Sequence, residues 1–371
     1  MPRRYLIAPD KFKGSLSAPE AAAAMANGVR RADPSAKIDL CPIADGGEGF
    51  MESLATALGG KWIDCPAVDA LDRSIESHYV LANTPQGLTA IMEMAETAGL
   101  WRLSARERNP LLTSTRGTGM QMAHAVSNHR VKRIILGIGG SATNDGGAGM
   151  AEALGIAFLD ETGKTISPIP SHWSDVRRID ASNRIPLPEV IAACDVENPL
   201  LGERGATAVF SAQKGATPEM KIRLEAALAH LVQISGGEKA ALVPGAGAAG
   251  GLGFGLLHFA DAKLISGFEL LAGLLDLENR IKSADHVLTG EGSIDHQSLD
   301  GKGPVGLAKM AATLGKPVTG FCGISDQAAR DSKIFTSLHA LADSGLPLET
   351  LIAEAAPLLT DLVAKKIVDR G

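Results

Sequence analysis

The chain has 371 residues, of which 45% are hydrophobic and 21% charged, and its formal net charge is −6. This length is enough for more than one hydrophobic core. A mildly acidic chain has no overall positive field for nucleic acid or anionic membranes, so we expect neither as a partner. No apolar run approaches the ~18 residues of a membrane span, and the cysteines lack metal-ligand spacing. We therefore expect a cytoplasmic protein.

The N-terminal part of the chain has the pattern of a strand–helix–strand unit. Residues 5–8 are a short apolar run, and residues 37–43 are predicted to be a second strand. Between them, Ser17 and Glu20 have the spacing of a capping box, which predicts a helix that continues to about residue 31. Such a unit is the building block of a parallel sheet.

The rest of the chain predicts two further groups of elements. In the middle we expect strands at residues 79–82, 89–94, 133–138, 190–193 and 207–210. Near the C-terminus we expect strands at 286–288, 317–321 and 335–340, with helices at 304–314 and 347–368. Because two N-terminal strands are too few for a stable doubly wound sheet, we expect both chain ends to share one sheet.

The predicted fold class is therefore α/β with two α/β domains. Residues 1–66 and 285–371 would form a Rossmann-like domain whose parallel sheet is built from both chain ends. Residues 67–284 would form an inserted α/β domain rich in glycine loops.

The first candidate site residues follow the two N-terminal strands. Lys11, Lys13 and Ser15 lie in the loop after the first strand. In open α/β sheets ligands bind at the carboxyl ends of strands, and the side chains of these three residues suit an anion. Asp45 follows the second strand with Gly46 and Gly47, a pattern that suits Mg²⁺ or a hydroxyl substrate. A tight turn before a helix would explain the same acidic residue.

The most informative motif is the glycine-rich segment at residues 137–149, which follows a predicted strand and precedes a predicted helix. Backbone N–H groups in such a turn face phosphate, and here Gly139, Gly140, Ser141 and Asn144 are the candidate contacts. Asp145 is a candidate cation ligand.

The same segment loosely matches a dinucleotide-binding fingerprint, Gly137-x-Gly139-x-x-Ala142, and Asp160 follows at about the expected distance. This match keeps an NAD(P)-dependent oxidoreductase as an alternative function.

Further charged residues occur in glycine-containing loops downstream. They are Asp195, Lys214, Glu291, Asp295 and Lys302. Each alone would fit a turn. Together they match the needs of phosphoryl transfer, which are cations and N–H donors for phosphates and carboxylates for Mg²⁺ and for the acceptor hydroxyl. A non-catalytic protein that binds a phosphorylated metabolite is a further alternative, although it would not need several carboxylates.

Several stretches together resemble the glycerate kinase family of the bacterial glycerate 2-kinase type (type I). They are residues 8–18, 42–50, 137–155, 193–202, 213–216, 245–255 and 288–298, in the family's order. The resemblance implies an ATP-dependent phosphotransferase that uses Mg²⁺, with D-glycerate as acceptor and 2-phosphoglycerate as product. The chain departs from the family at Ser293, where relatives usually carry arginine, and Arg116 is a candidate to replace that charge.

We therefore assign candidate roles as follows, without an expectation for the oligomeric state. Catalytic roles fall to Asp45, Asp195, Asp295, Lys11 and Lys13. Substrate or phosphate binding falls to Ser15, Gly46, Gly47, Gly139, Gly140, Ser141, Asn144, Lys214, Glu291 and Lys302. Mg²⁺ binding falls to Asp145 and Asp195.

Overall fold

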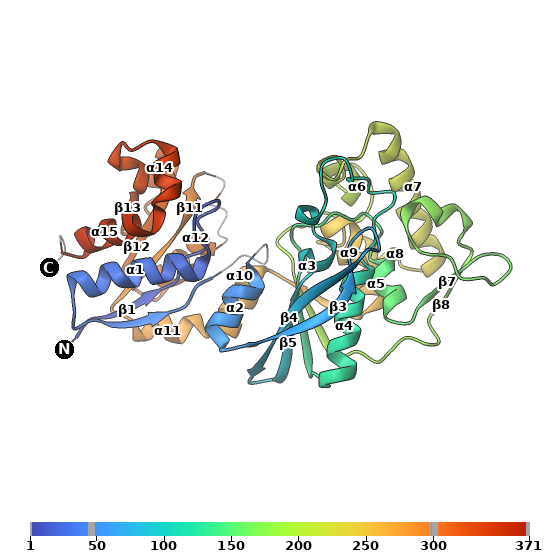
Figure 1. Cartoon of the computed structure of the whole chain (residues 1–371), viewed down its shortest axis with the longest axis horizontal. Coiled ribbons are helices and arrows are strands. Elements are labelled where there is room, and N and C mark those ends of the chain that lie inside the picture. Colours follow the sequence, from blue (N-terminus) through green and yellow to red (C-terminus); the bar gives the residue numbers. More distant parts are fainter. Residues whose placement is uncertain (1, 44–48, 297, 299–302, 369–371) are drawn as a thin grey trace. The chain divides into compact units, whose positions relative to one another are not determined.

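The computed structural model describes residues 2–43, 49–296, 298 and 303–368. The chain separates into two compact units (Figure 1). Unit 1 comprises Met1–Asp45, Glu52–Gly59 and Gly267–Gly371, and unit 2 comprises Gly46–Met51 and Gly60–Ser266. The domain boundaries expected at residues 66 and 284 are shifted in this division. The first shift arises because β3 (Lys61–Val68) pairs along its whole length with β4 (Ser74–Thr84) of unit 2.

Unit 1 contains a five-stranded parallel sheet of order β13-β12-β11-β1-β2. Its strands are β1 (Arg4–Ile7), β2 (Lys37–Leu40), β11 (His286–Ile294), β12 (Val318–Ser325) and β13 (Ser337–Ala340). In the centre, Tyr5 of β1 pairs with His286 of β11. The prediction that both chain ends build one parallel sheet is therefore confirmed.

Helices cover the unit 1 sheet. They are α1 (Ala18–Ala32), α10 (Gly267–Leu274), α11 (Leu277–Ser283), α12 (Gly303–Thr313), α13 (Gln327–Asp331), α14 (Leu348–Ala353) and α15 (Ala355–Val368). A further helix, α2 (Phe50–Leu58), is assigned to unit 1 from Glu52 onward. The predicted capping box starts α1, since Ser17 Oγ accepts from Glu20 N and Glu20 Oε2 accepts from Ser17 N. α1 packs on α15, and buried side chains such as Tyr5, Ile7 and Met25 form the core beneath them.

Unit 2 is built on a six-stranded mixed sheet of order β10-β9-β6-β5-β4-β3. Its further strands are β5 (Gly87–Glu93), β6 (Arg133–Gly137), β9 (Glu189–Ala193) and β10 (Lys263–Ile265), and β7 (Ala157–Leu159) pairs separately with β8 (Arg178–Asp180). β3, β4 and β5 are antiparallel, whereas β5, β6, β9 and β10 are parallel. The parallel half therefore brings several strand ends to one edge of the sheet.

The helices of unit 2 are mostly short. They are α3 (Ala95–Ala98), α4 (Arg116–His129), α5 (Ala148–Ala153), α6 (Ala206–Phe210), α7 (Pro218–Ser235), α8 (Glu238–Ala241) and α9 (Ala248–Phe259), with 3₁₀ turns at Leu100–Arg102 (η1), Pro170–Asp175 (η2) and Ala212–Lys214 (η3). The strand predicted at residues 207–210 is wrong, because this segment is α6. Thr207 O accepts hydrogen bonds from both Ser211 N and Ser211 Oγ, which closes a helical turn in spite of the β-branched residues.

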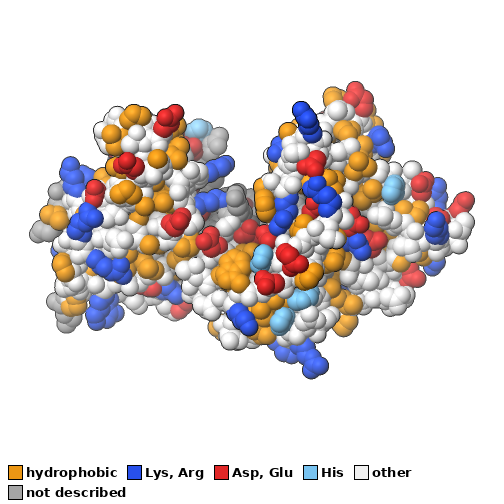
Figure 2. Space-filling view, in the orientation of Figure 1, with side chains coloured by type: hydrophobic (Ala, Val, Ile, Leu, Met, Phe, Trp, Pro, Cys, Tyr) orange, Lys and Arg blue, Asp and Glu red, His pale blue; other side chains and the backbone are white. Residues whose placement is uncertain are grey.

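Acidic and basic side chains are interspersed over the face drawn in Figure 2. Among the residues that the structure describes, no helix combines the length and apolar character needed to cross a membrane.

The contact between α1 and α15 gives a test of the fold of unit 1. A Cβ at Gly28 would lie 2.6 Å from Thr360 O and 2.7 Å from Val363 Cβ. We expect Gly28→Ala to lower the free energy of unfolding by about 1–3 kcal/mol, because overpacking exceeds the gain in helix propensity. Chemical denaturation measures the change.

Gly273 in α10 is the matched control, because a Cβ there would meet no atom within 4 Å. Gly273→Ala should leave stability unchanged or raise it by up to about 1 kcal/mol. If Gly28→Ala is as stable as the Gly273→Ala variant, the close packing of α1 on α15 is refuted.

Candidate functional site

In unit 1, the loop after β1 continues to pair with β11. Asp10 N donates to Gly290 O at 2.8 Å, and Gly292 N donates to Lys11 O at 3.3 Å. In this pairing Asp10 continues the register of β1 opposite Glu291, so the backbone of Lys11 lies next to Gly292 at the carboxyl edge of the sheet.

A glycine brings the second lysine to the same edge. A Cβ at Gly292 would lie 2.8 Å from Lys13 N, so the backbone at Lys13 lies against β11. Ser15 Oγ donates to Phe12 O at 3.0 Å, which closes the turn that carries both lysines. The structure thus places the backbone of Lys11 and Lys13 beside Gly292, the residue after Glu291 in β11, and gives the Ser15 hydroxyl a bond within the turn.

Asp10 is a residue of this edge that the sequence analysis did not select. It is buried, with 8% of its surface exposed, and its Oδ1 accepts from Lys11 N at 2.6 Å. A Cβ at Gly303, the first residue of α12, would lie 3.3 Å from Asp10 Oδ2. A helix N-terminus stabilises a negative charge. The signal that would have found Asp10 is its position directly after a buried strand.

Asp295 follows β11 and is half-buried. It exchanges hydrogen bonds with Ser298, since Ser298 Oγ accepts from Asp295 N at 3.3 Å and Asp295 Oδ1 accepts from Ser298 N at 3.2 Å. The turn therefore fixes this carboxylate near the end of β11. The candidates Asp45, Gly46, Gly47 and Lys302 lie outside the described residues.

In unit 2, the first half of the glycine-rich loop is accessible to solvent. Gly139 is half-exposed and Gly140 exposed. Leu100 N donates to Gly140 O at 2.9 Å, and Gly140 has a left-handed φ of 72° that favours glycine. Gly139, Gly140 and the largely buried Ser141 therefore form a fixed turn that opens to solvent.

The second half of the loop is buried against a second glycine-rich segment, residues 245–255. A Cβ at Gly250 would lie 1.9 Å from Thr143 O, and one at Gly255 would lie 2.7 Å from Gly146 O. Gly146 N donates to Gly250 O at 3.1 Å. The glycines here permit backbone packing rather than contact with phosphate.

Asn144 belongs to this buried half. It has no exposed surface, and its Nδ2 donates to Thr207 Oγ1 at 3.2 Å. The predicted phosphate contact at Asn144 therefore does not fit the structure, because the side chain supports the loop from inside.

Asp145 is also fully buried. Its Oδ2 accepts from Thr115 N and Thr115 Oγ1, both at 2.8 Å, and from Gly149 N at 3.1 Å, while its Oδ1 accepts from Gly147 N at 3.2 Å. Burial raises the pKa of this carboxyl, and the hydrogen bonds oppose that rise. The prediction that Asp145 binds Mg²⁺ does not fit this arrangement, because the chain itself occupies both oxygens.

Lys214 likewise lies inside unit 2. Its Nζ donates to Thr143 O at 2.7 Å, and only 1% of the residue is exposed. Burial lowers the pKa of its ammonium to about 7, while the nearby Asp145 carboxylate opposes the shift. Lys214 therefore supports the glycine-rich loop, and the predicted phosphate contact is not accessible to it.

Asp195 lies beside the open half of the loop. β6 and β9 are parallel neighbours in which Gly137 pairs with Ala193, so Gly139 and Asp195 each follow at the same edge. Ser266 Oγ donates to Asp195 Oδ1 at 3.0 Å, and the carboxylate is half-buried. Among the described residues there is no group of three or more His, Cys, Asp or Glu side chains arranged to hold a metal ion.

Two further sequence expectations concern charged side chains of unit 2. Arg116 was the candidate to replace the arginine that is absent at position 293. Its guanidinium instead forms ion pairs with Asp72 at 2.7 Å and Glu152 at 3.6 Å. Asp160 lies in the turn after β7, where its Oδ1 accepts from Thr162 N and Lys164 N. The carboxylate of Asp160 is thus engaged within its own turn, as in an ordinary surface turn.

Lysines, carboxylates and glycine turns at the strand ends of α/β units are the features of a phosphotransferase. The glycerate kinase family model matches residues 5–369, and the chain belongs to that family. The resemblance seen in the sequence is confirmed, and neither the oxidoreductase nor the non-catalytic alternative is supported.

Similar proteins have been described in several bacteria. The chain is 45% identical to a glycerate kinase of Halalkalibacterium halodurans, over 86% of this chain and 84% of that protein. It is 41% identical to the glycerate 2-kinase of Escherichia coli, over 86% and 85% respectively. The crystal structure of a protein described as putative glycerate kinase 2 from Salmonella typhimurium LT2 superposes with a TM-score of 0.88 at 36% identity, covering 100% of this chain and 98% of that one.

The buried ammonium of Lys214 gives a test of stability against pH. Its pKa is about 7 in the folded protein and about 10.4 in an unfolded chain. Between these values the unfolded chain binds more protons, so the free energy of unfolding should rise with pH, by at most about 1.4 kcal/mol per unit. Urea denaturation between about pH 7.5 and 9.5 measures this slope.

Lys214→Met should lose this rise, whereas Lys239→Met, at an exposed position of α8, should keep it. Equal slopes in the wild type and Lys214→Met would show that the pKa of Lys214 is not lowered in the folded protein.

Proposed function

We propose that this protein transfers the γ-phosphoryl group of ATP to the 2-hydroxyl of D-glycerate, giving 2-phosphoglycerate and ADP. The observation that carries the proposal is the match of residues 5–369 to the glycerate kinase family. The 2-hydroxyl is chosen because one relative, 41% identical, is described as a glycerate 2-kinase. Because ATP is the phosphoryl donor, we infer that the protein acts in the cytoplasm.

In unit 2, the open turn at Gly139–Ser141 is the proposed phosphate contact. Backbone N–H groups held in a fixed turn bind an anion without reorganising during the reaction. Two contacts fix this turn, namely the hydrogen bond from Leu100 N to Gly140 O and the packing of the adjoining buried residues.

In unit 1, Lys11 and Lys13 are the proposed cations for the substrates' negative groups. Asp10 and Glu291 lie at the same edge, so it carries carboxylates as well as lysines. A lysine ammonium is a flexible point charge, well suited to a phosphate or carboxylate whose position changes in the reaction.

Mg²⁺ is the proposed metal, and in unit 2 the half-buried carboxylate of Asp195 suits its preference for oxygen ligands. Mg²⁺ commonly takes one or two carboxylates together with substrate phosphates, so it does not require a cluster supplied by the protein alone. When bound, it would neutralise negative charge on the phosphates.

The proposed reaction needs a group that accepts the hydroxyl proton. The 2-hydroxyl oxygen forms a bond to the γ-phosphorus, the bond from that phosphorus to the β–γ bridging oxygen breaks, and the electron pair leaves with ADP. The proton passes to a carboxylate, for which Asp295, Asp195 and the sequence-based candidate Asp45 are proposed.

The proposed function predicts a defined product. Purified protein with ATP and Mg²⁺ should release ADP when D-glycerate is added, and phosphorus NMR should show 2-phosphoglycerate. L-glycerate and lactate are the matched acceptor controls. If folded protein releases no ADP with D-glycerate, the kinase proposal is wrong, and if the product is 3-phosphoglycerate, only the choice of hydroxyl is wrong.

The carboxylates give a second test. Asp45→Asn, Asp195→Asn and Asp295→Asn each remove one candidate base or ligand with little change in volume. A lost general base lowers kcat by about 10²–10⁴-fold, so at least one variant should fall in this range with an unchanged melting temperature. Asp160→Asn, in the exposed turn after β7, is the control and should retain kcat. If all three site variants also retain kcat, the site assignment is refuted.

A further inference from the structure

Trp101, in the 3₁₀ turn η1, combines exposure with a fixed position. It is 62% exposed, compared with 47% for Trp62 and 1% for Trp173. Its indole N–H nevertheless donates to Ala95 O at 2.9 Å, and its ring covers Gly99, where a Cβ would lie 2.8 Å from the ring atoms Cδ1 and Nε1. A single exposed tryptophan is ordinary in a soluble protein, but this one is held in place without being buried.

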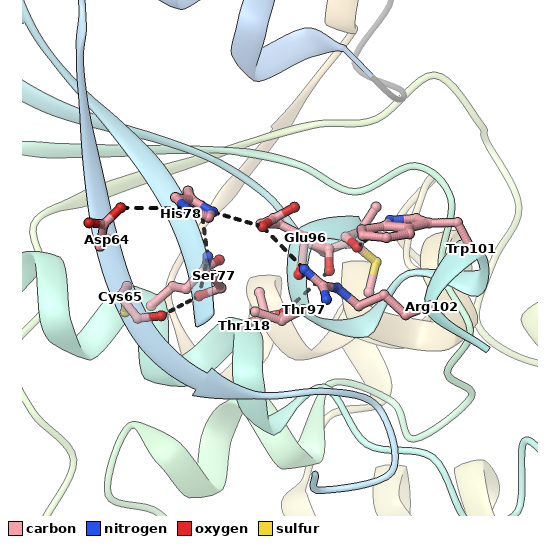
Figure 3. Close-up of polar contacts among 12 residues, drawn as sticks. Asp64, Cys65, Ser77, His78, Glu96, Thr97, Trp101, Arg102 and Thr118 are labelled. Carbon is pink, nitrogen blue, oxygen red and sulfur yellow. Dashed lines mark hydrogen bonds and ion pairs between the residues drawn. The ribbon is translucent and has the colours of Figure 1, made fainter. Parts of the chain in front are cut away.

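Arg102 supports the ring from one side. Its guanidinium carbon lies 4.3 Å from the centre of the Trp101 ring. The guanidinium is itself anchored, because Nε donates to Glu96 O at 2.7 Å and Nη2 contacts Glu96 Oε1 at 3.2 Å. Glu96 is held in turn by His78, and His78 by Asp64 (Figure 3). These contacts hold the guanidinium in place, and the bond from the indole N–H to Ala95 O holds the ring.

The platform, defined as Trp101 with Arg102, is joined to the open glycine turn. Gly99 faces Ser141 in an antiparallel bridge, and Leu100 N donates to Gly140 O at 2.9 Å. Trp101 therefore comes directly after the two residues, Gly99 and Leu100, that pair with the proposed phosphate-binding turn of the same unit.

We propose that the platform binds the adenine base of ATP by stacking on the Trp101 ring, an inference that rests on the proposed kinase function. Bases stack on aromatic rings and on arginine planes through their π-faces. An indole that is already fixed loses little freedom when a base binds, so the contact contributes more to affinity. The base then lies next to the turn that binds the phosphates of the same nucleotide.

Stacking predicts a loss of affinity for the nucleotide rather than of catalytic rate. Trp101→Ala should raise KM for ATP by about 5- to 150-fold, the range for loss of one stacked base. The kcat at saturating ATP and the KM for D-glycerate should stay within about twofold of the wild-type values. Trp101→Phe should recover most of the affinity, and Trp62→Ala, at the other exposed tryptophan of unit 2, should leave KM for ATP unchanged.

A phosphoryl donor without a base isolates the contact. With methyl triphosphate in place of ATP, the wild type and Trp101→Ala should have equal kcat/KM, because stacking is absent from both. A defect of Trp101→Ala that is equally large with methyl triphosphate would mean that the residue shapes the phosphate turn, and would overturn the base-binding role.

Fluorescence tests binding without turnover. Titration with ADP should quench tryptophan emission in the wild type and in Trp62→Phe, and the quenching should disappear in Trp101→Phe. Quenching that persists in Trp101→Phe, or an unchanged KM for ATP in Trp101→Ala, overturns the proposal. So does self-association that depends on Trp101 while KM for ATP stays the same, because the ring would then be a protein contact.

The outcomes for the base site and for the kinase reaction are separable. If the wild type transfers phosphate from ATP to D-glycerate but Trp101→Ala is unaffected, the base site is wrong and the kinase stands. If ADP quenches Trp101 but no glycerate is phosphorylated, the nucleotide platform stands and the acceptor is wrong.

Discussion

The contact between residues 143–147 and residues 250–255 is the constraint on which the site in unit 2 depends. Two backbones meet there without side chains between them, since a Cβ at Gly250 would overlap Thr143 O at 1.9 Å. The second segment reaches this contact through left-handed φ values at Ala249, Gly250 and Gly251. Because interiors are close-packed, such a contact cannot deform gradually. The open turn at Gly139–Ser141 is therefore attached to a rigid base.

Two buried polar side chains, Asp145 and Lys214, stabilise the same contact between residues 143–147 and residues 250–255. Asp145 ties the loop to Thr115 and to the start of α5, and Lys214 holds Thr143 O from the other side. Leaving a buried polar group without its hydrogen-bond partner typically costs about 1–3 kcal/mol. These residues therefore act on phosphate binding through the shape of the loop, and not by touching the substrate.

Much of the fold follows from local patterns in the sequence. The capping box at Ser17 and Glu20 marks the start of α1, and apolar runs mark β1, β6 and β9. Local sequence patterns gave the wrong secondary structure where contacts between distant segments determine it. Residues 207–210 contain the β-branched Thr207 and Val209 and were predicted as a strand. They belong instead to helix α6, in which the Thr207 hydroxyl accepts from Asn144. β3 was missed because an antiparallel partner, β4, stabilises it.

The candidate site residues were likewise predictable from the sequence only in part. Position after a strand was sufficient to select Lys11, Asp195 and Asp295, because strand ends follow from local sequence. It was not sufficient to separate accessible from buried residues, and Asn144, Asp145 and Lys214 are all enclosed. The glycines that indicated a phosphate cradle serve partly to admit residues 250–255, more than a hundred positions along the chain. Burial depends on such distant segments, so no local motif reveals it.

Parallel strand pairing explains how both units gather polar groups at a sheet edge. In unit 2, the pairing of Gly137 with Ala193 places Gly139 and Asp195 at equal distances beyond the two strands. In unit 1, bonds from Ala8 N to Leu288 O and from Asp10 N to Gly290 O carry the pairing past β1, so Asp10 lies opposite Glu291 and Lys11 follows at the same edge. Phosphoryl transfer depends on positioning and charge rather than on a reactive side chain. Strand pairing fixes the positions of these loops before the substrate binds, so the polar groups that the loops carry are already positioned for the reaction.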